Sequence, residues 1–196
     1  MNGMPIMAAA ALVVFCGVAH AGEISSAYTD VDFDEHCSTF ESGQDGEEFA
    51  NMVCDGWRGY PVLVSAGDLR ESLFYGFPPE GTLPWESFSA FNRTGPRIEW
   101  RIEAQGAMSA PFATIHRWFV NTDPDNAEKT TEVLVVSKVG QVADRKGCVV
   151  GLVRATGNPD ANVAARKIAD ESARNFVCGR DQAVRVGNVP DFSRSE

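Results

Sequence analysis

The sequence predicts an α+β fold: an antiparallel sheet of about six strands with one long C-terminal helix packed on it, stapled by disulfides. Residues 98–103 read Ile-Glu-Trp-Arg-Ile-Glu, and this strict alternation of apolar and charged residues is typical of a half-buried strand. Residues 159–177 instead carry apolar residues at helical spacing. Two such periodicities in one chain favour a sheet with a helix on one face.

The alternating stretch defines the centre of the predicted sheet. Within residues 98–103, the isoleucines and the tryptophan are expected to face a core and the charged residues to face water. Residues 104–110 are mostly small and suit a connection. Residues 112–120 follow, rich in the aromatic and branched residues that favour strands. We therefore expect a hairpin, in which the faces taken by His116 and Trp118 stay open.

Further short strands are expected before and after this hairpin. Pro78 and Pro79 end one run, because proline cannot donate to a strand ladder. The segment from there to Thr94 is a long, aromatic loop, and long ordered loops often carry function. The other predicted strands are residues 27–33, 49–54, 62–64, 69–77, 132–139, 148–155 and 183–186.

The helix has recognisable start and stop signals. Asn158 suits the N-cap, Pro159 the first helical position, and Asp160 complements the helix dipole. Gly179 is placed to end the helix. We expect it to run from Pro159 to about Val177.

Residues 1–21 predict a signal peptide. Residues 7–18 form an apolar run too short for an ordinary membrane span, and Ala19-His20-Ala21 fits a cleavage site. Removal of this segment leaves 175 of the 196 residues, which suits one domain with a proper core. We expect residues 22–196 to form a single α+β domain that is periplasmic or secreted and does not contact the membrane after cleavage.

The chain is acidic, with a net charge of −10 and a pI near 4.8. Such a charge disfavours binding to nucleic acid or to anionic membranes. It suits a basic partner, although acidity is also an ordinary route to solubility. The expected partner is an unknown protein or small molecule.

Four cysteines remain after signal removal: Cys37, Cys54, Cys148 and Cys178. An even number in an exported chain predicts disulfides, and three pairings are possible. We favour Cys37–Cys54 and Cys148–Cys178, because each pair lies within one half of the chain and flanks a compact unit. The lack of a C-x-x-C motif argues against a thioredoxin-like site and a zinc knuckle.

Six stretches of the sequence carry a family resemblance: YTDVDFDEHC, DGWRGYPV, GDLRESLFYGF, GPRIEWRI, PFATIHRWF and NPDANVAARKIADESARNFVC. Together they resemble a family of exported bacterial proteins that is defined by sequence and has no established activity. The resemblance covers nearly the whole chain after the signal segment. It implies export and a single domain, and it supplies no catalytic residue.

One acidic run matches part of a metal-binding pattern. Asp30, Asp32, Asp34 and Glu41 occupy positions 1, 3, 5 and 12 of an EF-hand calcium loop. However, Glu35 stands where the loop needs a glycine, and no amphipathic helices flank the segment. A strand with a solvated acidic face is the favoured interpretation, so we predict no metal site and keep calcium as the alternative.

Aromatic side chains are the candidate ligand contacts. They are Trp57, Tyr60, Trp85 and Trp118, in a wider set that includes Phe88 and Phe91. Such residues line binding grooves, but they also fill cores, and the core is the favoured interpretation.

The sequence contains no G-x-S-x-G, H-E-x-x-H or Gly-rich phosphate motif. We therefore predict an exported binding or interaction module without a cofactor, either a small-ligand-binding domain or an inhibitor of a secreted enzyme. The alternative is a secreted hydrolase with a dispersed pair of carboxylates. An enzyme should place two acids with raised pKa in one deep cleft, whereas a binding module should expose an aromatic patch.

Overall fold

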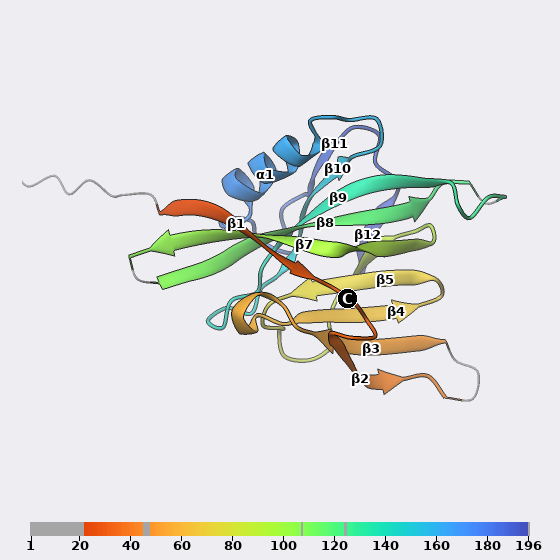
Figure 1. The fold of residues 1–196 in the computed structure, drawn as a ribbon, viewed down its shortest axis with the longest axis horizontal. Coiled ribbons are helices and arrows are strands. Elements are labelled where there is room, and N and C mark those ends of the chain that lie inside the picture. The colour runs from red at the N-terminus through yellow and green to blue at the C-terminus, as the bar shows by residue number, and fades with distance from the viewer. Residues whose placement is uncertain (1–21, 45–47, 107, 124, 196) are drawn as a thin grey trace, which may run out of the picture.

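A computed structural model describes residues 22–44, 48–106, 108–123 and 125–195. The predicted signal peptide, residues 1–21, lies outside the described residues. Six strands form the main sheet, in the order β1-β7-β8-β9-β10-β11 (Figure 1). Their bounds are Glu23–Asp30, Asn92–Gln105, Met108–Asn121, Thr130–Lys138, Cys148–Arg154 and Val184–Val186. Neighbouring strands are antiparallel, except that β11 is parallel to β10.

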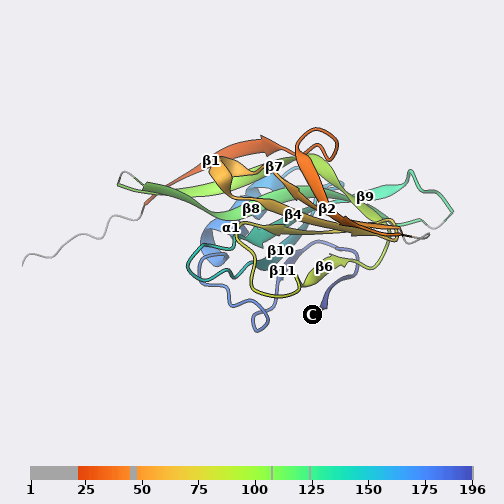
Figure 2. The same cartoon turned by 90° about the horizontal axis from the view of Figure 1, so that it is seen from below.

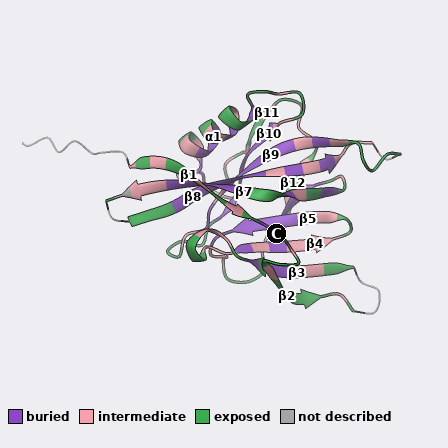
Figure 3. Ribbon diagram, in the orientation of Figure 1, coloured by how far each residue is buried: buried purple, intermediate pink, exposed green. Residues whose placement is uncertain are grey.

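A second, four-stranded sheet packs against one face of the first (Figure 2). Its antiparallel strands follow chain order: β2 (Cys37–Ser42), β3 (Phe49–Cys54), β4 (Val62–Gly67) and β5 (Arg70–Tyr75). A short 3-10 turn, η1 (Trp57–Gly59), connects β3 to β4. The edge strand β2 is largely exposed, whereas β5 is mostly buried (Figure 3).

The remaining strands pair with each other: β6 (Trp85–Phe88) and β12 (Phe192–Ser195) form a two-stranded antiparallel sheet. The helix α1 (Ala161–Ser172) covers the face of the six-stranded sheet opposite the four-stranded one. The molecule therefore has three layers: helix, six-stranded sheet and four-stranded sheet.

Two apolar clusters separate these layers. The inter-sheet cluster includes Val62, Trp100 and Trp118, each at most 2% exposed. The helix-side cluster joins the alanine-rich face of α1 to β8, β9 and β10. A Cβ at Gly151 of β10 would lie 2.6 Å from Ile168 Cγ2 of α1, so the close approach of the helix requires a glycine there.

The predicted fold class is wrong. The described residues form twelve strands in three sheets and one α-helix of 12 residues, so the chain is mostly β. Short strands without a clear alternation, such as β6 and β12, form because they pair with partners that are distant in the chain. Tertiary pairing overrides weak local preference in such segments.

The predicted helix is also too long. It begins at Ala161 with Asp160 at the N-cap, and Asn158 instead accepts the backbone N–H of Asp160 through its side chain. The chain leaves the α-helix after Ser172. The Lys138 ammonium then donates to the carbonyls of Arg174 and Phe176, at 3.1 and 3.0 Å, which holds the following segment in an irregular conformation.

The hairpin and both disulfides are confirmed. Strands β7 and β8 pair antiparallel around the predicted connection. Cys37 and Cys54 lie opposite each other in β2 and β3, and Cys148–Cys178 ties the start of β10 to the segment after α1. Two intramolecular disulfides indicate an oxidising compartment. In the described part of the chain, no helix is long and apolar enough to cross a membrane.

The charged face of residues 98–103 does not face water, contrary to prediction. Glu99 and Arg101 are only 7% and 9% exposed, because α1 covers them. Glu99 pairs with Arg166 at 2.7 Å, and Arg101 pairs with Asp170 at 2.7 Å. A third pair, Arg174–Glu103, extends the row just beyond the helix end at 3.3 Å.

The spacing of this charged row follows from backbone geometry. On and after the helix, successive charged residues of the row are four positions apart, which corresponds to about 6 Å of helical rise. On the strand they are two positions apart, which corresponds to about 6.6 Å. The two repeats therefore stay in step over three pairs. We call this row the charge ladder.

Candidate functional site

A groove of about 550 Å³ lies where the four-stranded sheet meets the ends of the long strands of the main sheet. Its lining comes from β3, from the turn between β4 and β5, from the start of β7, from the end of β8 and from the start of β9. We call it the hairpin groove, after the β4–β5 turn that forms one wall.

Exposed apolar side chains line this groove. Leu69 is 70% exposed, Phe91 50% and Phe49 36%. They come from the β4–β5 turn, the approach to β7 and the start of β3, so chain topology alone brings them together. Clustered exposed apolar residues are characteristic of interaction sites, whereas single ones are ordinary.

The β4–β5 turn is conformationally strained. Asp68 and Leu69 both have positive φ angles, 51° and 55°. Aspartate tolerates this left-handed region, but for leucine it costs about 1–2 kcal/mol. The Leu69 carbonyl accepts the backbone N–H of Asn92 at 3.0 Å, which attaches the turn to β7. A strained and exposed leucine contributes little to folding, so a role in binding is the natural reason for it.

Four of the five charged residues that line the groove already have partners in the described structure, and the fifth, Glu48, is exposed. Arg70 forms a 2.8 Å ion pair with Asp68, and the guanidinium of Arg93 stacks 4.3 Å from the centre of the Phe119 ring. Glu71 accepts the backbone N–H of Thr94 at 2.8 Å. Burial raises the pKa of Glu71, and the Thr94 hydrogen bond partly opposes that shift. The groove therefore offers mainly apolar contacts to a binding partner.

A buried polar pair lies between the two sheets, away from the groove. The Tyr75 hydroxyl donates to His116 Nδ1 at 2.8 Å, and His116 Nε2–H donates to the carbonyl of Gly95 at 2.6 Å. Burial lowers the pKa of His116 to about 4, although the Gly95 hydrogen bond acts in the opposite direction. Both side chains are at most 2% exposed, so this pair joins the sheets and does not meet a ligand.

Two acids have a raised pKa among the described residues, Glu71 and Glu86, and burial is the main cause for both. Both oxygens of Glu86 accept the backbone N–H of Val149, and Arg194 lies 3.5 Å away. Glu71 lines the hairpin groove, whereas Glu86 lines a different pocket. These two acids therefore do not form the paired carboxylates that a hydrolase would need.

The aromatic residues singled out from the sequence are mostly dispersed. Trp57 and Tyr60 lie together, with ring centres 6.3 Å apart, and the Tyr60 hydroxyl donates to Gln141. Trp85 is partly buried in β6, and Trp118 is 2% exposed in the inter-sheet cluster. Only Phe91 of the wider aromatic set lines the hairpin groove. Phe49 and Leu69 were missed because each looks like an ordinary strand residue in sequence.

Three of the four acids of the calcium-like run have other partners. Asp30 pairs with Arg97 at 2.9 Å, and Asp32 accepts the backbone N–H of Asp34 in a tight turn. Glu41 lies on β2 and accepts the side-chain amide of Asn51. In the parts of the chain that the structure describes, no three His, Cys, Asp or Glu residues are grouped to hold a metal ion.

Comparisons with known proteins found no protein-family model, no curated sequence and no solved structure that matches this chain. The candidate site therefore rests on its own geometry.

Proposed function

We propose that this protein is an exported binding module, and that the hairpin groove holds an apolar segment of a partner protein. The observation that carries the proposal is Leu69, which is 70% exposed and held at φ 55° beside two exposed phenylalanines. Folding alone favours another residue at such a position.

The form of the groove favours a protein partner over a small ligand. Small-molecule pockets enclose most of the ligand surface, and their lining is largely buried before binding. Here the three large apolar lining residues Leu69, Phe91 and Phe49 are themselves 36–70% exposed, so a larger surface must cover them. A lining of apolar and aromatic residues with little free charge is typical of the centre of a protein interface.

The proposal includes export of the protein from the cytoplasm. Residues 1–21 act as a cleaved signal peptide, which places the mature chain in the periplasm or outside the cell. The two disulfides fit that destination. The resemblance to exported bacterial proteins without established activity is compatible with it and adds no partner.

The test begins with a variant that carries a photo-crosslinking residue in place of Phe91 and is crosslinked in its native compartment. A variant with the same residue in place of Val163 is the control. Val163 lies on α1 and is 66% exposed, similar to Leu69. A partner captured at position 91 and not at position 163 is then purified, and its affinity is measured by calorimetry.

The Leu69→Asn variant separates binding from folding. Asparagine tolerates a positive φ, so the stability of this variant should equal or exceed wild type by up to about 1 kcal/mol. Its affinity for the purified partner should fall at least about tenfold, while Val163→Asn binds like wild type. Equal affinity of Leu69→Asn and wild type, or no crosslink specific to position 91, would contradict the proposal.

A further inference from the structure

A second pocket, of about 430 Å³, has a different chemistry from the hairpin groove. Its lining contains no Asp or Glu but includes five basic residues: Lys138, Arg145, Lys146, Arg174 and Arg194. The whole chain carries a net charge of −10, so this concentration of positive charge runs against the composition of the protein. We call this site the basic pocket.

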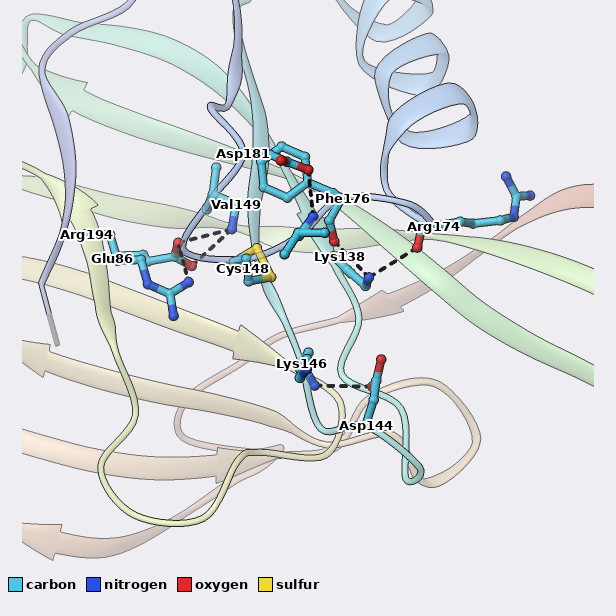
Figure 4. Close-up of a disulfide and its surroundings, with 12 residues drawn as sticks. Glu86, Lys138, Asp144, Lys146, Cys148, Val149, Arg174, Phe176, Asp181 and Arg194 are labelled. Atoms are coloured by element: carbon cyan, nitrogen blue, oxygen red, sulfur yellow. Dashed lines mark hydrogen bonds and ion pairs between the residues drawn. A yellow bond between two sulfur atoms is a disulfide. The ribbon is translucent and has the colours of Figure 1, made fainter.

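Segments far apart in sequence form the basic pocket. Lys138 ends β9, Arg145 and Lys146 lie in the loop before β10, and Arg194 belongs to β12. The segment after α1, residues 174–178, closes another side, and Cys178 anchors it to Cys148 at the start of β10 (Figure 4). The disulfide therefore fixes one wall of the pocket.

In the described structure, three of the basic side chains form no ion pair with a carboxylate. The ammonium of Lys138 donates to two backbone carbonyls, and Arg145 donates to the carbonyl of Pro78 at 3.3 Å. Near Lys146, the carboxylate of Asp144 accepts the backbone N–H, not the ammonium. Carbonyl oxygens orient these groups but do not neutralise them, so three positive charges remain in one pocket.

The two other arginines contribute differently. The guanidinium of Arg174 points away from Lys138 and pairs with Glu103, so its backbone is what borders Lys138 (Figure 4). Arg194 approaches Glu86 at 3.5 Å, while its Nε is buried and has no acceptor among the described residues. A buried donor without an acceptor costs about 1–3 kcal/mol, which a bound anion would recover.

We propose that the basic pocket binds a small oxyanion that carries two or more phosphate-type groups. Because several cations around one pocket are not neutralised, a ligand with more than one negative group should bind best there. The pocket volume limits the ligand to a small molecule. The overall negative charge of the chain disfavours a long polyanion such as nucleic acid. This site is separate from the hairpin groove, and its failure would leave the proposed function untouched.

The test is calorimetric titration of the folded, oxidised protein with inorganic pyrophosphate at about 20 mM ionic strength. Binding at a single site is expected, with orthophosphate at least about tenfold weaker. Lys146→Gln and Arg145→Gln should each weaken pyrophosphate binding at least about tenfold. Lys167→Gln removes the same charge from the exposed side of α1, outside the pocket, and should bind like wild type.

Thermal unfolding of each variant accompanies the titrations, and the two pocket variants serve as independent tests if one of them is destabilised. No pyrophosphate binding by wild type would overturn the proposal. So would equal weakening by Lys167→Gln, because that result indicates general charge attraction and not a built site. Orthophosphate binding as tight as pyrophosphate would overturn the multivalent character of the ligand.

Discussion

The two faces of β7 are covered in chemically different ways. Toward the four-stranded sheet, Ile98, Trp100 and Ile102 are between 0% and 6% exposed in an apolar cluster. Toward α1, the alternate residues are charged and pair with a second charged row on and after the helix. One strand thus joins the molecule's two interfaces, one apolar and one ionic.

The two faces therefore contribute differently to the stability of the fold and to the position of α1 on the sheet. Apolar burial contributes about 25 cal/mol per Å² and depends little on direction. A buried charge costs several kcal/mol unless its partner is in place, so ion pairs add little net stability but penalise wrong registers strongly. We infer that the inter-sheet face supplies most of the stabilisation, while the charge ladder sets where α1 lies on the sheet.

Truncation on the apolar face should have the largest effect. Trp100→Ala removes a side chain with 0% exposure, together with its 2.8 Å hydrogen bond to Thr29. We expect a loss of about 3–5 kcal/mol in the free energy of unfolding, measured by urea denaturation. The partly exposed Trp57 provides the control, because Trp57→Ala should cost clearly less. Equal losses for both would refute the assignment of stability to this face.

The second-largest effect should come from acidification, which should reduce the stability that the buried His116 gives the inter-sheet face. The unfolded chain protonates His116 near pH 6.5, whereas the folded chain does so near pH 4. Between these values the unfolded state binds more protons, so this contribution is complete above pH 6.5 and is lost as pH falls toward 4. The loss is about 3 kcal/mol.

The measurement is the free energy of unfolding of wild type and His116→Gln over this pH range. The difference between them isolates His116, because other acids titrate in both proteins. Glu99 is one such acid. Burial raises its pKa, but the hydrogen bonds and charges of its partners outweigh burial and lower it overall. Parallel pH profiles for the two proteins would rule out the buried histidine as the cause.

The middle pair of the charge ladder should have an intermediate effect. Arg101→Met leaves Asp170 and Glu99 without their shared cation, and we expect a cost of about 1–3 kcal/mol, reduced from a fully buried pair by the 28% exposure of Asp170. The double variant Arg101→Met/Asp170→Leu should recover part of this cost, with a coupling of about 1–2 kcal/mol. Additive costs within about 0.3 kcal/mol would show that the pair does not act as a unit.

The outer pair of the ladder should have the smallest effect. The Glu103 and Arg174 side chains are 22% and 29% exposed, and their charged atoms are 3.3 Å apart. Glu103→Gln should therefore cost less than about 1 kcal/mol, measured by the same urea denaturation. A cost equal to that of Arg101→Met would contradict a ladder that weakens toward solvent.

Several elements of the fold could be predicted from local sequence pattern, and the predictions that failed have specific causes. The central hairpin followed from the alternation of residues 98–103, and the disulfide pairing followed from the positions of the cysteines. The same alternation assigned the charged face of that strand to water, because a period of two reports that the faces differ but not what covers each. The helix that covers this face begins near residue 161, far away in the chain.

The candidate site was less accessible. Phe49, Leu69 and Phe91 lie about twenty residues apart in three different segments, and none stands in a motif. Leu69 reads as the first residue of a strand, and its positive φ follows from the two-residue turn that joins β4 to β5. Aromatic content alone drew attention to tryptophans, which the structure uses mainly for packing.

The sequence by itself determined the central hairpin and the presence of a helix near the C-terminus, and it favoured the two cysteine pairs among three possible pairings. Each depends on periodicity or on spacing within a short part of the chain. Only the tertiary structure decided the mostly β architecture, the burial of the charge ladder, the hairpin groove and the basic pocket. These depend on contacts between residues distant in the chain, because whether a charged or apolar side chain meets water is set by the layer that packs over it.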